Sequence, residues 1–346
     1  MLDQRAALEW VAENIGGFGG DASRVTLVGQ SAGATSVAYH LLSSASRALF
    51  GGAISQSNPM AVPLKSVDQA REEGDVLLKK ANCSDALCLK SLSLEALLEA
   101  QMEAMRHFRP LHPLLIFYAW SPVVDEQPMN ALAKGAAGSI PVMYGTLVNE
   151  TNLFAGALEP RGLSPLEYVA LVTELFPLHV DAVLHEYPPS RLGNATLTAA
   201  FLMTELLFSC ANRLAFSGMT GPVYQYVFSH PMSFAKQWWD GNWLCYDASC
   251  HAGELPFLFG SIPLLNLTET SDEQQLTRRM QVYWNNFAHS GDPNVGPQQV
   301  DVEWPLLGSE SSRAYLRLET PQPAVQTNYR GAECDFLDKI RLTDGR

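Results

Sequence analysis

Positive charge is scarce in this 346-residue sequence. Lys and Arg together number 23 against 36 Asp and Glu, which makes the formal net charge −13 at pH 7. This acidic balance argues against nucleic acid or an anionic membrane surface as a partner. The sequence also lacks any run of about 18 or more apolar residues, so we expect no transmembrane segment. It contains no internal repeat and no low-complexity segment, and its 47% hydrophobic content is ample for a sizeable core.

Targeting signals are missing from both ends. Met1–Trp10 lacks the basic and then apolar segments of a signal peptide, and Ile340–Arg346 is neither a lipid-anchor tail nor a retention signal. The termini alone indicate a cytosolic protein, but six cysteines and several glycosylation sequons indicate the secretory pathway. We therefore expect that a segment is missing before Met1 and that the full-length protein is secreted or lies in the secretory-pathway lumen. The sequons begin at Asn82, Asn149, Asn194 and Asn266.

The pattern of apolar residues predicts an α/β fold with a mostly parallel sheet and a single domain over residues 1–346. Helical excursions are expected at about 66–110 and 155–218, where the pattern turns helical. The strand over 51–57 has no polar alternation, which is typical of a strand buried on both faces. Strands are predicted over 25–28, 51–57, 140–148, 222–229 and 314–318, and helices over 3–15 and 274–289.

The central motif is Gly29-Gln30-Ser31-Ala32-Gly33. It follows the strand Val25–Val28 and precedes a segment in which Ala34, Val37, Ala38 and Leu41 have helical spacing. Strand, Gly-x-Ser-x-Gly and helix in succession form a nucleophile elbow, which exposes a serine hydroxyl above the carboxyl end of a sheet. Ser31 is therefore the candidate nucleophile. The alternative is an accidental match in a glycine-rich loop.

A serine hydroxyl needs a general base, and the base needs a third group to orient it. In α/β-hydrolases these groups follow in the order Ser, acid, His, on loops after later strands. Of the eight histidines, His251 lies in a loop after a strand, beside Gly and Cys. Glu150 directly follows the strand Pro141–Val148 and is the candidate acid, with Asp125 as the alternative.

These residues and their order resemble the type-B carboxylesterases, the family that includes cholinesterases and bacterial para-nitrobenzyl esterases. The resemblance spans nearly the whole chain and implies the α/β-hydrolase fold, here lacking its N-terminal strands. It is carried by Leu2-Asp3-Gln4-Arg5, Phe18-Gly19-Gly20-Asp21, Gly29 to Gly33, Gln56-Ser57, Pro122-Val123-Val124-Asp125, Gly145 to Glu150, His251 to Gly260 and Gly291-Asp292-Pro293-Asn294.

The resemblance implies a catalytic triad of Ser31, Glu150 and His251, the same residues that the motif order selects. It implies no cofactor and no metal ion. The Ala32 N–H is the remaining oxyanion-hole donor, because the glycine-rich loop that supplies the other donors in this family belongs to the missing segment. Gln30 stands where cholinesterases carry Glu, which argues against a choline ester as the substrate.

Of two further positions near the expected site, one departs from the family pattern and one matches it. Ser57 belongs to Gln56-Ser57-Asn58-Pro59, which replaces the usual Gln-Ser-Gly and could reshape the acyl pocket. Glu254 matches a buried family glutamate near the site, and its protonation state is open. Together with Gly29, Gln30 and Gly33, these two residues complete the set that we expect around the triad.

The resemblance also implies how the six cysteines pair, although their number alone allows 15 full pairings. The competing idea for one pair is a zinc site made by Cys245, Cys250 and His251, which lacks a nearby fourth ligand. The implied disulfides are Cys83 with Cys88, Cys210 with Cys334, and Cys245 with Cys250.

The sequence thus predicts a hydrolase of a small-molecule or lipid-like carboxylic ester that acts through a serine acyl-enzyme. The alternatives are a catalytically impaired fragment and a non-catalytic adhesion or scaffold protein on the same fold. Because the strand Val25–Val28 would lack its earlier neighbour, we expect that the chain expressed by itself is insoluble or inactive. The identity of the ester, the oligomeric state and glycan occupancy at Asn82, Asn194 and Asn266 stay open.

Overall fold

The computed structural model describes residues 1–108, 120–124, 126–308 and 312–344. The alternative acid Asp125 lies outside the described residues. The chain divides into two compact units, each considered by itself below. The sheet unit comprises Met1–Ala61 and Pro128–Arg346, and the helical unit comprises Val62–Gln127. The helical unit contains the helical excursion expected at about 66–110. The sequence analysis expects this excursion to belong to the same domain as the sheet.

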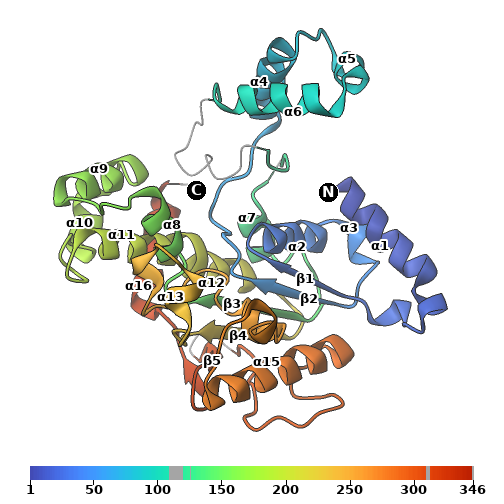
Figure 1. The fold of residues 1–346 in the computed structure, drawn as a ribbon, viewed down its shortest axis with the longest axis vertical. Coiled ribbons are helices and arrows are strands. Elements are labelled where there is room, and N and C mark those ends of the chain that lie inside the picture. The colour runs from blue at the N-terminus through green and yellow to red at the C-terminus, as the bar shows by residue number, and fades with distance from the viewer. Residues whose placement is uncertain (109–119, 125, 309–311, 345–346) are drawn as a thin grey trace. The chain divides into compact units, whose positions relative to one another are not determined.

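The sheet unit is built on six strands in the order β1-β2-β3-β4-β5-β6 (Figure 1). The first four neighbouring pairs are parallel and β5–β6 is antiparallel, so the predicted α/β fold with a mostly parallel sheet is confirmed. The register places Gln30 beside Gln56, and Gln56 beside Gly145, at the carboxyl ends of the first three strands. The strands are β1 (Thr26–Gln30), β2 (Gly52–Gln56), β3 (Val142–Leu147), β4 (Val223–Phe228), β5 (Ala314–Leu318) and β6 (Ala324–Thr327).

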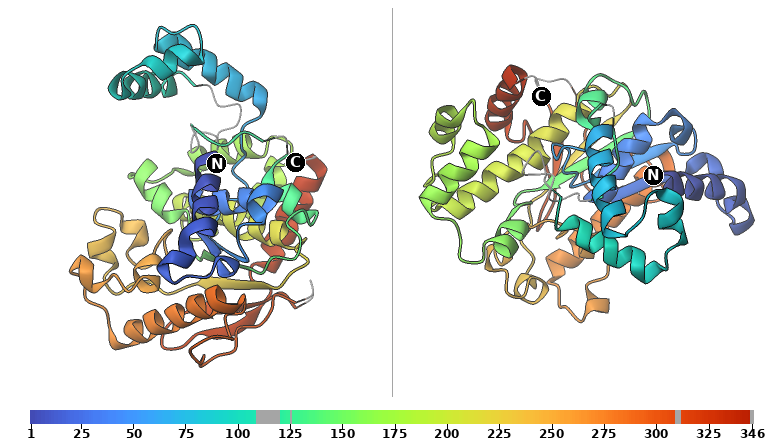
Figure 2. Two further views of the ribbon diagram at one scale, coloured as in Figure 1. Left: turned by 90° about the vertical axis from the view of Figure 1, so that its right-hand side faces the viewer. Right: turned by 90° about the horizontal axis from the view of Figure 1, so that it is seen from above.

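Alternate residues of the strands enter two different hydrophobic cores, because successive side chains of a strand point to opposite faces. In β3, Met143 belongs to the core that contains α15, whereas Tyr144 belongs to the core that contains α2, α7 and α12. Figures 1 and 2 show α15 lying along one face of the sheet. Every residue of β2, β3 and β4 is buried, as predicted for the strand over 51–57.

Strand β1 is less buried than its neighbours. It pairs with β2 on one side and has no second neighbour among the described strands. Its residues are partly or fully exposed, and Val28 is 48% exposed. An apolar strand of a parallel sheet is normally covered on both faces, but β1 is not. One backbone edge of β1 also has no partner among the described strands.

The helices of the sheet unit begin and end at local signals in the sequence. For example, Thr270 and Glu273 form a capping box at the start of α15, and Gly291 ends it with φ 78°. The helices are α1 (Leu2–Asn14), α2 (Ala32–Leu42), α3 (Ser44–Arg47), α7 (Pro128–Ala133), α8 (Asn152–Leu158), α9 (Pro165–Leu175), α10 (Val180–Glu186), α11 (Ala195–Thr204), α12 (Cys210–Phe216), α13 (Ala235–Trp238), α14 (Leu255–Leu258), α15 (Ser271–Ser290) and α16 (Gly331–Asp344).

Several short turns of helix complete this unit. The 3-10 turns are η1 (Ile15–Phe18), η2 (Ala22–Arg24), η5 (Trp243–Cys245) and η6 (Pro263–Leu265). Between α11 and α12 lies a π-helical turn, η4 (Glu205–Ser209), so these three elements form one continuous helical stretch. This stretch, Ala195–Phe216, is the one described helix long and apolar enough to cross a membrane, and 83% of its most apolar window is buried inside the protein.

The helical unit consists of α4 (Val67–Lys80), α5 (Ala86–Ser91) and α6 (Leu94–Met105). A capping box between Ser66 and Gln69 starts α4. Its C-terminal Lys80 donates to Glu103 of α6 at 3.2 Å, which joins the two long helices. The disulfide Cys83–Cys88 closes the connection between α4 and α5.

Candidate active site

Ser31 lies in the sharp turn between β1 and α2, with φ 57° and ψ −122°. A positive φ is strained for a residue with a Cβ, and such strain concentrates at functional sites. The Ser31 N–H donates to the carbonyl of Gln56 at 2.9 Å, which fixes the turn to the end of β2. A Cβ on Gly29 would lie 2.2 Å from the carbonyl oxygen of Gly33, so only glycine fits at the first motif position.

The imidazole of His251 and the carboxylate of Glu150 form a short hydrogen bond. His251 Nδ1 lies 2.6 Å from Glu150 Oε2, and both side chains are buried. Glu150 is fixed in turn, because its Oε1 accepts from Thr146 Oγ1 at 2.9 Å and from the Leu147 N–H at 2.8 Å. A backbone bridge between Asn149 and Cys250 places the two loops side by side. The acid and the base selected from the sequence are therefore in contact.

This contact sets the protonation of the imidazole. Burial pulls the pKa of His251 down, but the charge and hydrogen bond of Glu150, together with the charge of Glu254, outweigh burial and raise it above its usual range. Nδ1 carries a proton toward Glu150, which leaves Nε2 as an acceptor. That tautomer is the one that a general base needs.

The Ser31 hydroxyl, however, does not reach this base in the structure. Within the described part of the chain, Ser31 Oγ forms no hydrogen bond to His251. Instead, Gln30 Nε2 lies 3.2 Å from His251 Nε2 and donates to it. The structure thus brings Glu150, His251 and Gln30 together, with Ser31 adjacent on the elbow. Gln30 must release Nε2 before a Ser31–His251 hydrogen bond can form.

Behind the triad lies a buried polar layer. Gln56 Nε2 donates to Glu254 Oε1 at 3.1 Å, and Trp284 Nε1 donates to Gln56 Oε1 at 3.3 Å. Burial and the nearby charge of Glu150 raise the pKa of Glu254 to about 7. Glu254 is therefore a carboxyl group with a pKa near neutral pH beside the Glu150–His251 pair.

Backbone strain also gathers at this site. Ser57 has φ 49° and Ala252, directly after His251, has φ 67°. Ser57 is fully buried, and its N–H donates to the Gly145 carbonyl at 2.8 Å. Together with Ser31, three of the positive-φ residues that are not glycine surround one constellation, which supports a functional role for it.

Two phenylalanines that the sequence did not reveal flank the imidazole. The ring of Phe154 in α8 lies 5.2 Å from the His251 ring, and the ring of Phe208 in η4 lies 5.4 Å from it. Phe154 could have been considered, because it lies four residues after Glu150 in sequence. No pattern in the sequence indicates Phe208, because it lies far from His251 in sequence and in the π-helical turn η4.

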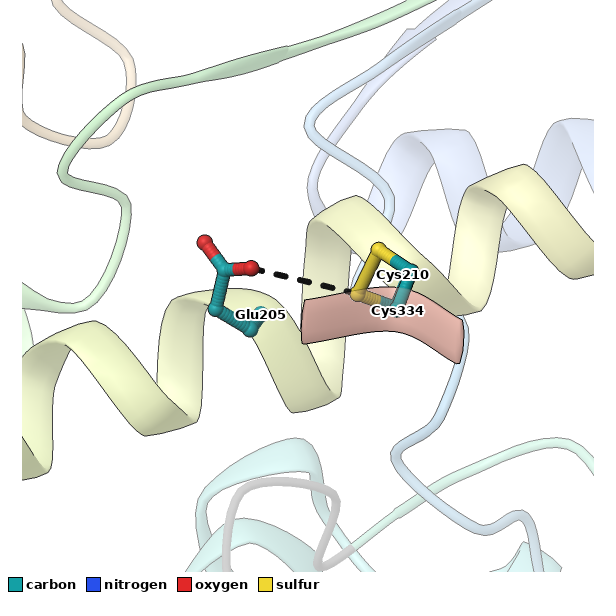
Figure 3. A group of neighbouring side chains, drawn as sticks. All are labelled: Glu205, Cys210 and Cys334. Atoms are coloured by element: carbon teal, nitrogen blue, oxygen red, sulfur yellow. Dashed lines mark hydrogen bonds between the residues drawn. A yellow bond between two sulfur atoms is a disulfide. The ribbon is translucent and has the colours of Figure 1, made fainter. Parts of the chain in front are cut away.

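The three disulfides that the resemblance implies are all present: Cys83–Cys88, Cys210–Cys334 and Cys245–Cys250. The sulfurs of Cys245 and Cys250 are joined in a disulfide, so neither is a free thiolate that could bind zinc. His251 Nδ1 is occupied by its hydrogen bond to Glu150. One group in the described residues, Glu205 with Cys210 and Cys334, has a ligand set within 4.8 Å (Figure 3). Both of its sulfurs are joined in the disulfide, which removes them as thiolate ligands.

Comparison with known proteins shows the family of the chain. The sequence profile of the carboxylesterase family matches residues 1–337. The chain is 33% identical over 352 residues to the cAMP-regulated D2 protein of Dictyostelium discoideum, covering 98% of this chain and 64% of the relative. It is 33% identical over 363 residues to an acylcarnitine hydrolase of Mus musculus, covering 98% of this chain and 61% of that protein. The chain thus spans less than two thirds of these curated relatives.

Solved structures agree with the sequence relatives. A PNB esterase superposes with a TM-score of 0.76 at 29% identity, covering 97% of this chain and 68% of the other. A thermophilic PNB esterase superposes with a TM-score of 0.77 at 27% identity, covering 97% and 67% of the two chains.

Proposed function

Because the chain belongs to the carboxylesterase family, we propose that it is built to hydrolyse carboxylic esters through a serine acyl-enzyme. The observation that carries this proposal is the 2.6 Å contact between Glu150 and His251, with the Nε2 acceptor beside the Ser31 elbow. A base that is oriented by a carboxylate and located next to an exposed serine turn is the arrangement that acyl transfer needs.

In the proposed reaction, Ser31 Oγ attacks the ester carbonyl carbon while His251 Nε2 takes the hydroxyl proton. Glu150 stabilises the resulting imidazolium, and the Ala32 N–H donates to the oxyanion. The tetrahedral intermediate collapses when the imidazolium gives its proton to the departing alkoxide oxygen, which leaves an acyl-Ser31. A water molecule then attacks the acyl carbon with His251 again as the base, and the carboxylic acid departs.

The proposed substrate is a small-molecule or lipid-like ester. The aromatic rings of Phe154 and Phe208 beside His251 support an apolar group near the reacting carbonyl. Relatives are named for different esters, including an acylcarnitine hydrolase and a pyrethroid hydrolase of Mus musculus. Gln30, which replaces the Glu of cholinesterases, favours an uncharged alcohol group over a choline.

Hydrolysis of p-nitrophenyl acetate by the purified chain tests the proposal. The Ser31→Ala variant is compared with Ser190→Ala, a serine that is exposed and far from the elbow in sequence. The proposal predicts hydrolysis above the buffer rate that Ser31→Ala abolishes and Ser190→Ala preserves. That result would overturn the expectation from the sequence that the chain by itself is insoluble or inactive. Equal hydrolysis by the wild type and the folded Ser31→Ala variant would contradict the assigned nucleophile.

A second candidate is a catalytically impaired protein on the same fold. It is favoured by the Gln30–His251 contact, since that contact occupies the Nε2 atom that Ser31 needs. A folded, monodisperse chain without hydrolysis would favour this candidate.

We also propose an oxidising compartment, either extracellular or in the secretory-pathway lumen. Three disulfides in one chain support it, because reducing compartments keep thiols free. Mass spectrometry of alkylated protein from its native source tests this proposal. We expect no cysteine to be alkylated before reduction. Alkylation of all six cysteines before reduction would contradict the proposal.

A further inference from the structure

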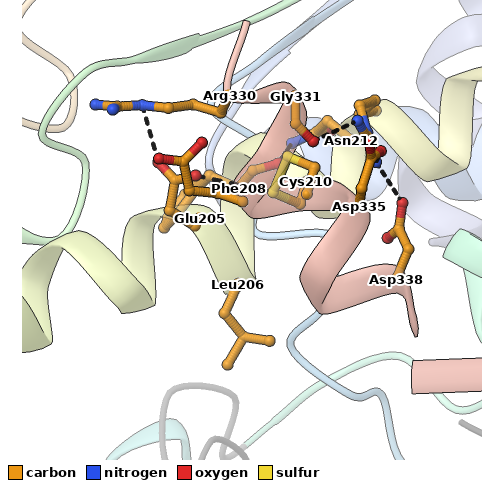
Figure 4. The surroundings of a disulfide bond; sticks show 12 residues. Glu205, Leu206, Phe208, Cys210, Asn212, Arg330, Gly331, Asp335 and Asp338 are labelled. Atoms are coloured by element: carbon orange, nitrogen blue, oxygen red, sulfur yellow. Dashed lines mark hydrogen bonds and ion pairs between the residues drawn. A yellow bond between two sulfur atoms is a disulfide. The ribbon is translucent and has the colours of Figure 1, made fainter. Parts of the chain in front are cut away.

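The π-helical turn η4 (Glu205–Ser209) connects the candidate base to the C-terminal part of the chain. π-Turns are rare, and they occur frequently at functional sites. Two side chains of this turn contact different parts of the protein. Phe208, which is 2% exposed, packs against the His251 ring, and Glu205 lies beside the segment that begins α16 (Figure 4).

Glu205 is fully buried and has a charged partner from far along the sequence. Its Oε1 lies 3.1 Å from Arg330 Nε, and its Oε2 lies 3.9 Å from Cys210 Sγ (Figures 3 and 4). The Arg330 guanidinium also covers the Phe201 ring of α11, 4.5 Å from its centroid. Burial raises the pKa of Glu205 to about 8, against the opposing charge of Arg330. Removing Arg330 would therefore leave a buried carboxyl group without its cation.

The same C-terminal segment contacts the other end of the π-turn. Cys210, the residue after η4, forms the disulfide with Cys334. Arg330 and Cys334 are one helical turn apart, and the Cys334 N–H donates to the Arg330 carbonyl at 2.9 Å. Arg330 itself has φ 53°, a strained value that this arrangement maintains. We call Arg330 and Cys334 the C-terminal anchor, since they fix both ends of η4.

We propose that the C-terminal anchor positions the catalytic base: Arg330 and the Cys210–Cys334 disulfide hold η4 so that Phe208 fixes the His251 ring. This inference rests on the proposed function of His251. The anchor residues touch neither the triad nor any reacting atom, so they are positioning residues. The groups that act on the His251 ring directly are Glu150, Glu254, Gln30, Phe154 and Phe208.

Hydrogen bonds from other segments also hold the backbone of η4. Asn212 Nδ2 donates to the Phe208 carbonyl at 2.7 Å and to the Asn58 carbonyl at 2.7 Å. These bonds fix the backbone from the α12 side. On the Glu205 side, Arg341 Nη2 donates to the Leu206 carbonyl at 2.6 Å, and the Glu205 carboxyl group pairs with Arg330. The proposal requires that loss of the Arg330 contact shifts this end of η4 and, with it, the Phe208 ring relative to His251.

The variant Arg330→Met tests the proposal, and Arg279→Met is its control. Arg279, on α15, has a side chain about as buried as that of Arg330 and pairs with Asp301 at 2.8 Å, although Asp301 is more exposed than Glu205. The first readout is the rate at which a fluorophosphonate labels Ser31 as a function of pH. We expect Arg330→Met to lower the plateau rate about tenfold, because small misplacements of a catalytic group are costly. We also expect it to change the apparent pKa of the profile, and Arg279→Met to change neither.

The second readout does not require activity. The His251 ring proton resonance is assigned by its loss in His251→Gln and is titrated by NMR. We expect its chemical shift and titration midpoint to change in Arg330→Met and not in Arg279→Met. A wild-type chain that takes no label would sink the proposed function and leave this titration as the test of the anchor.

If Arg330→Met does not fold, Glu205→Gln/Arg330→Met replaces the buried carboxyl group that has lost its partner and is measured in the same way. The pair Cys210→Ala/Cys334→Ala tests the other end of η4, with Cys83→Ala/Cys88→Ala as its control. Folded variants at Arg330 or Cys334 that keep both the labelling profile and the His251 titration of the wild type would overturn the proposal.

Discussion

At the scale of single residues, the two glycines of the elbow have different roles. A Cβ on Gly29 would overlap the backbone of Gly33 at 2.2 Å, whereas a Cβ on Gly33 would meet no atom within 4 Å. Backbone atoms cannot move aside as a flexible side chain can. The first glycine is therefore required for the turn to close, and the second is not required by packing.

We accordingly expect Gly29→Ala to destabilise the protein by about 1–3 kcal/mol or more, the usual cost of overpacking, and to abolish labelling of Ser31. Gly33→Ala should change the free energy of unfolding by less than about 0.5 kcal/mol. Urea denaturation measures both. Equal midpoints for the two variants would contradict the close approach of Gly29 to Gly33.

The pH dependence of the base belongs to the same scale. His251 must be neutral to accept a proton, and its pKa lies above the usual value of about 6.5. The labelling rate of Ser31 should therefore rise as the pH increases through that raised pKa. In Glu254→Gln one carboxylate that favours the imidazolium is removed, so the profile should move toward lower pH.

Stopped-flow or quenched labelling across pH 5 to 9 measures the profile. Glu174→Gln, on the exposed side of α9, is the control that should leave it unchanged. A profile of Glu254→Gln that coincides with the wild type, or moves toward higher pH, would show that Glu254 does not act on His251.

At the scale of elements, the sequence predicted what short-range patterns encode. The apolar runs of β2 and β3 contain nearly every residue of the observed strands, and Gly-x-Ser-x-Gly located the elbow. Strand β6 was missed because its four residues follow Pro321 and Pro323 and lack an apolar run. Two of the four are exposed and two are partly buried. The π-turn and the contact of Gln30 with His251 were also missed, since both depend on packing between segments far apart in sequence.

The disulfides allow a quantitative prediction about elements. The Cys210–Cys334 bridge joins the end of η4 to α16 across 124 residues, and Cys83–Cys88 spans five. In the chain-entropy model, a loop of about 125 residues is worth about 5 kcal/mol and one of about six residues about 2 kcal/mol. Replacing the long bridge by alanines should therefore cost more.

Chemical denaturation of the two double-alanine variants measures this difference in the free energy of unfolding. We expect Cys210→Ala/Cys334→Ala to lose roughly 3 kcal/mol more than Cys83→Ala/Cys88→Ala. A larger loss for the short bridge would mean that local geometry, and not loop closure, decides the stability.

At the scale of the whole molecule, we expect the open edge of β1 to promote association. Val28 is 48% exposed on a strand with no second neighbour in the described sheet, and unpaired edges of this kind promote aggregation. Val28→Lys should raise the monomer fraction measured by size-exclusion chromatography with light scattering. Val295→Lys, at an exposed loop position, should not. Equal monomer fractions would show that association does not use this edge.

The central claim is that the Glu150–His251 pair serves Ser31 as a nucleophile, although Gln30 occupies Nε2 in the structure. The most direct measurement is intact-mass spectrometry of the folded chain after exposure to a fluorophosphonate, followed by peptide mapping. We predict a single adduct on Ser31, which disappears in Ser31→Ala and forms about 10⁴-fold more slowly in Glu150→Gln, where the imidazole loses its orienting carboxylate. A folded chain with no adduct, or with its adduct on another residue, would contradict the account.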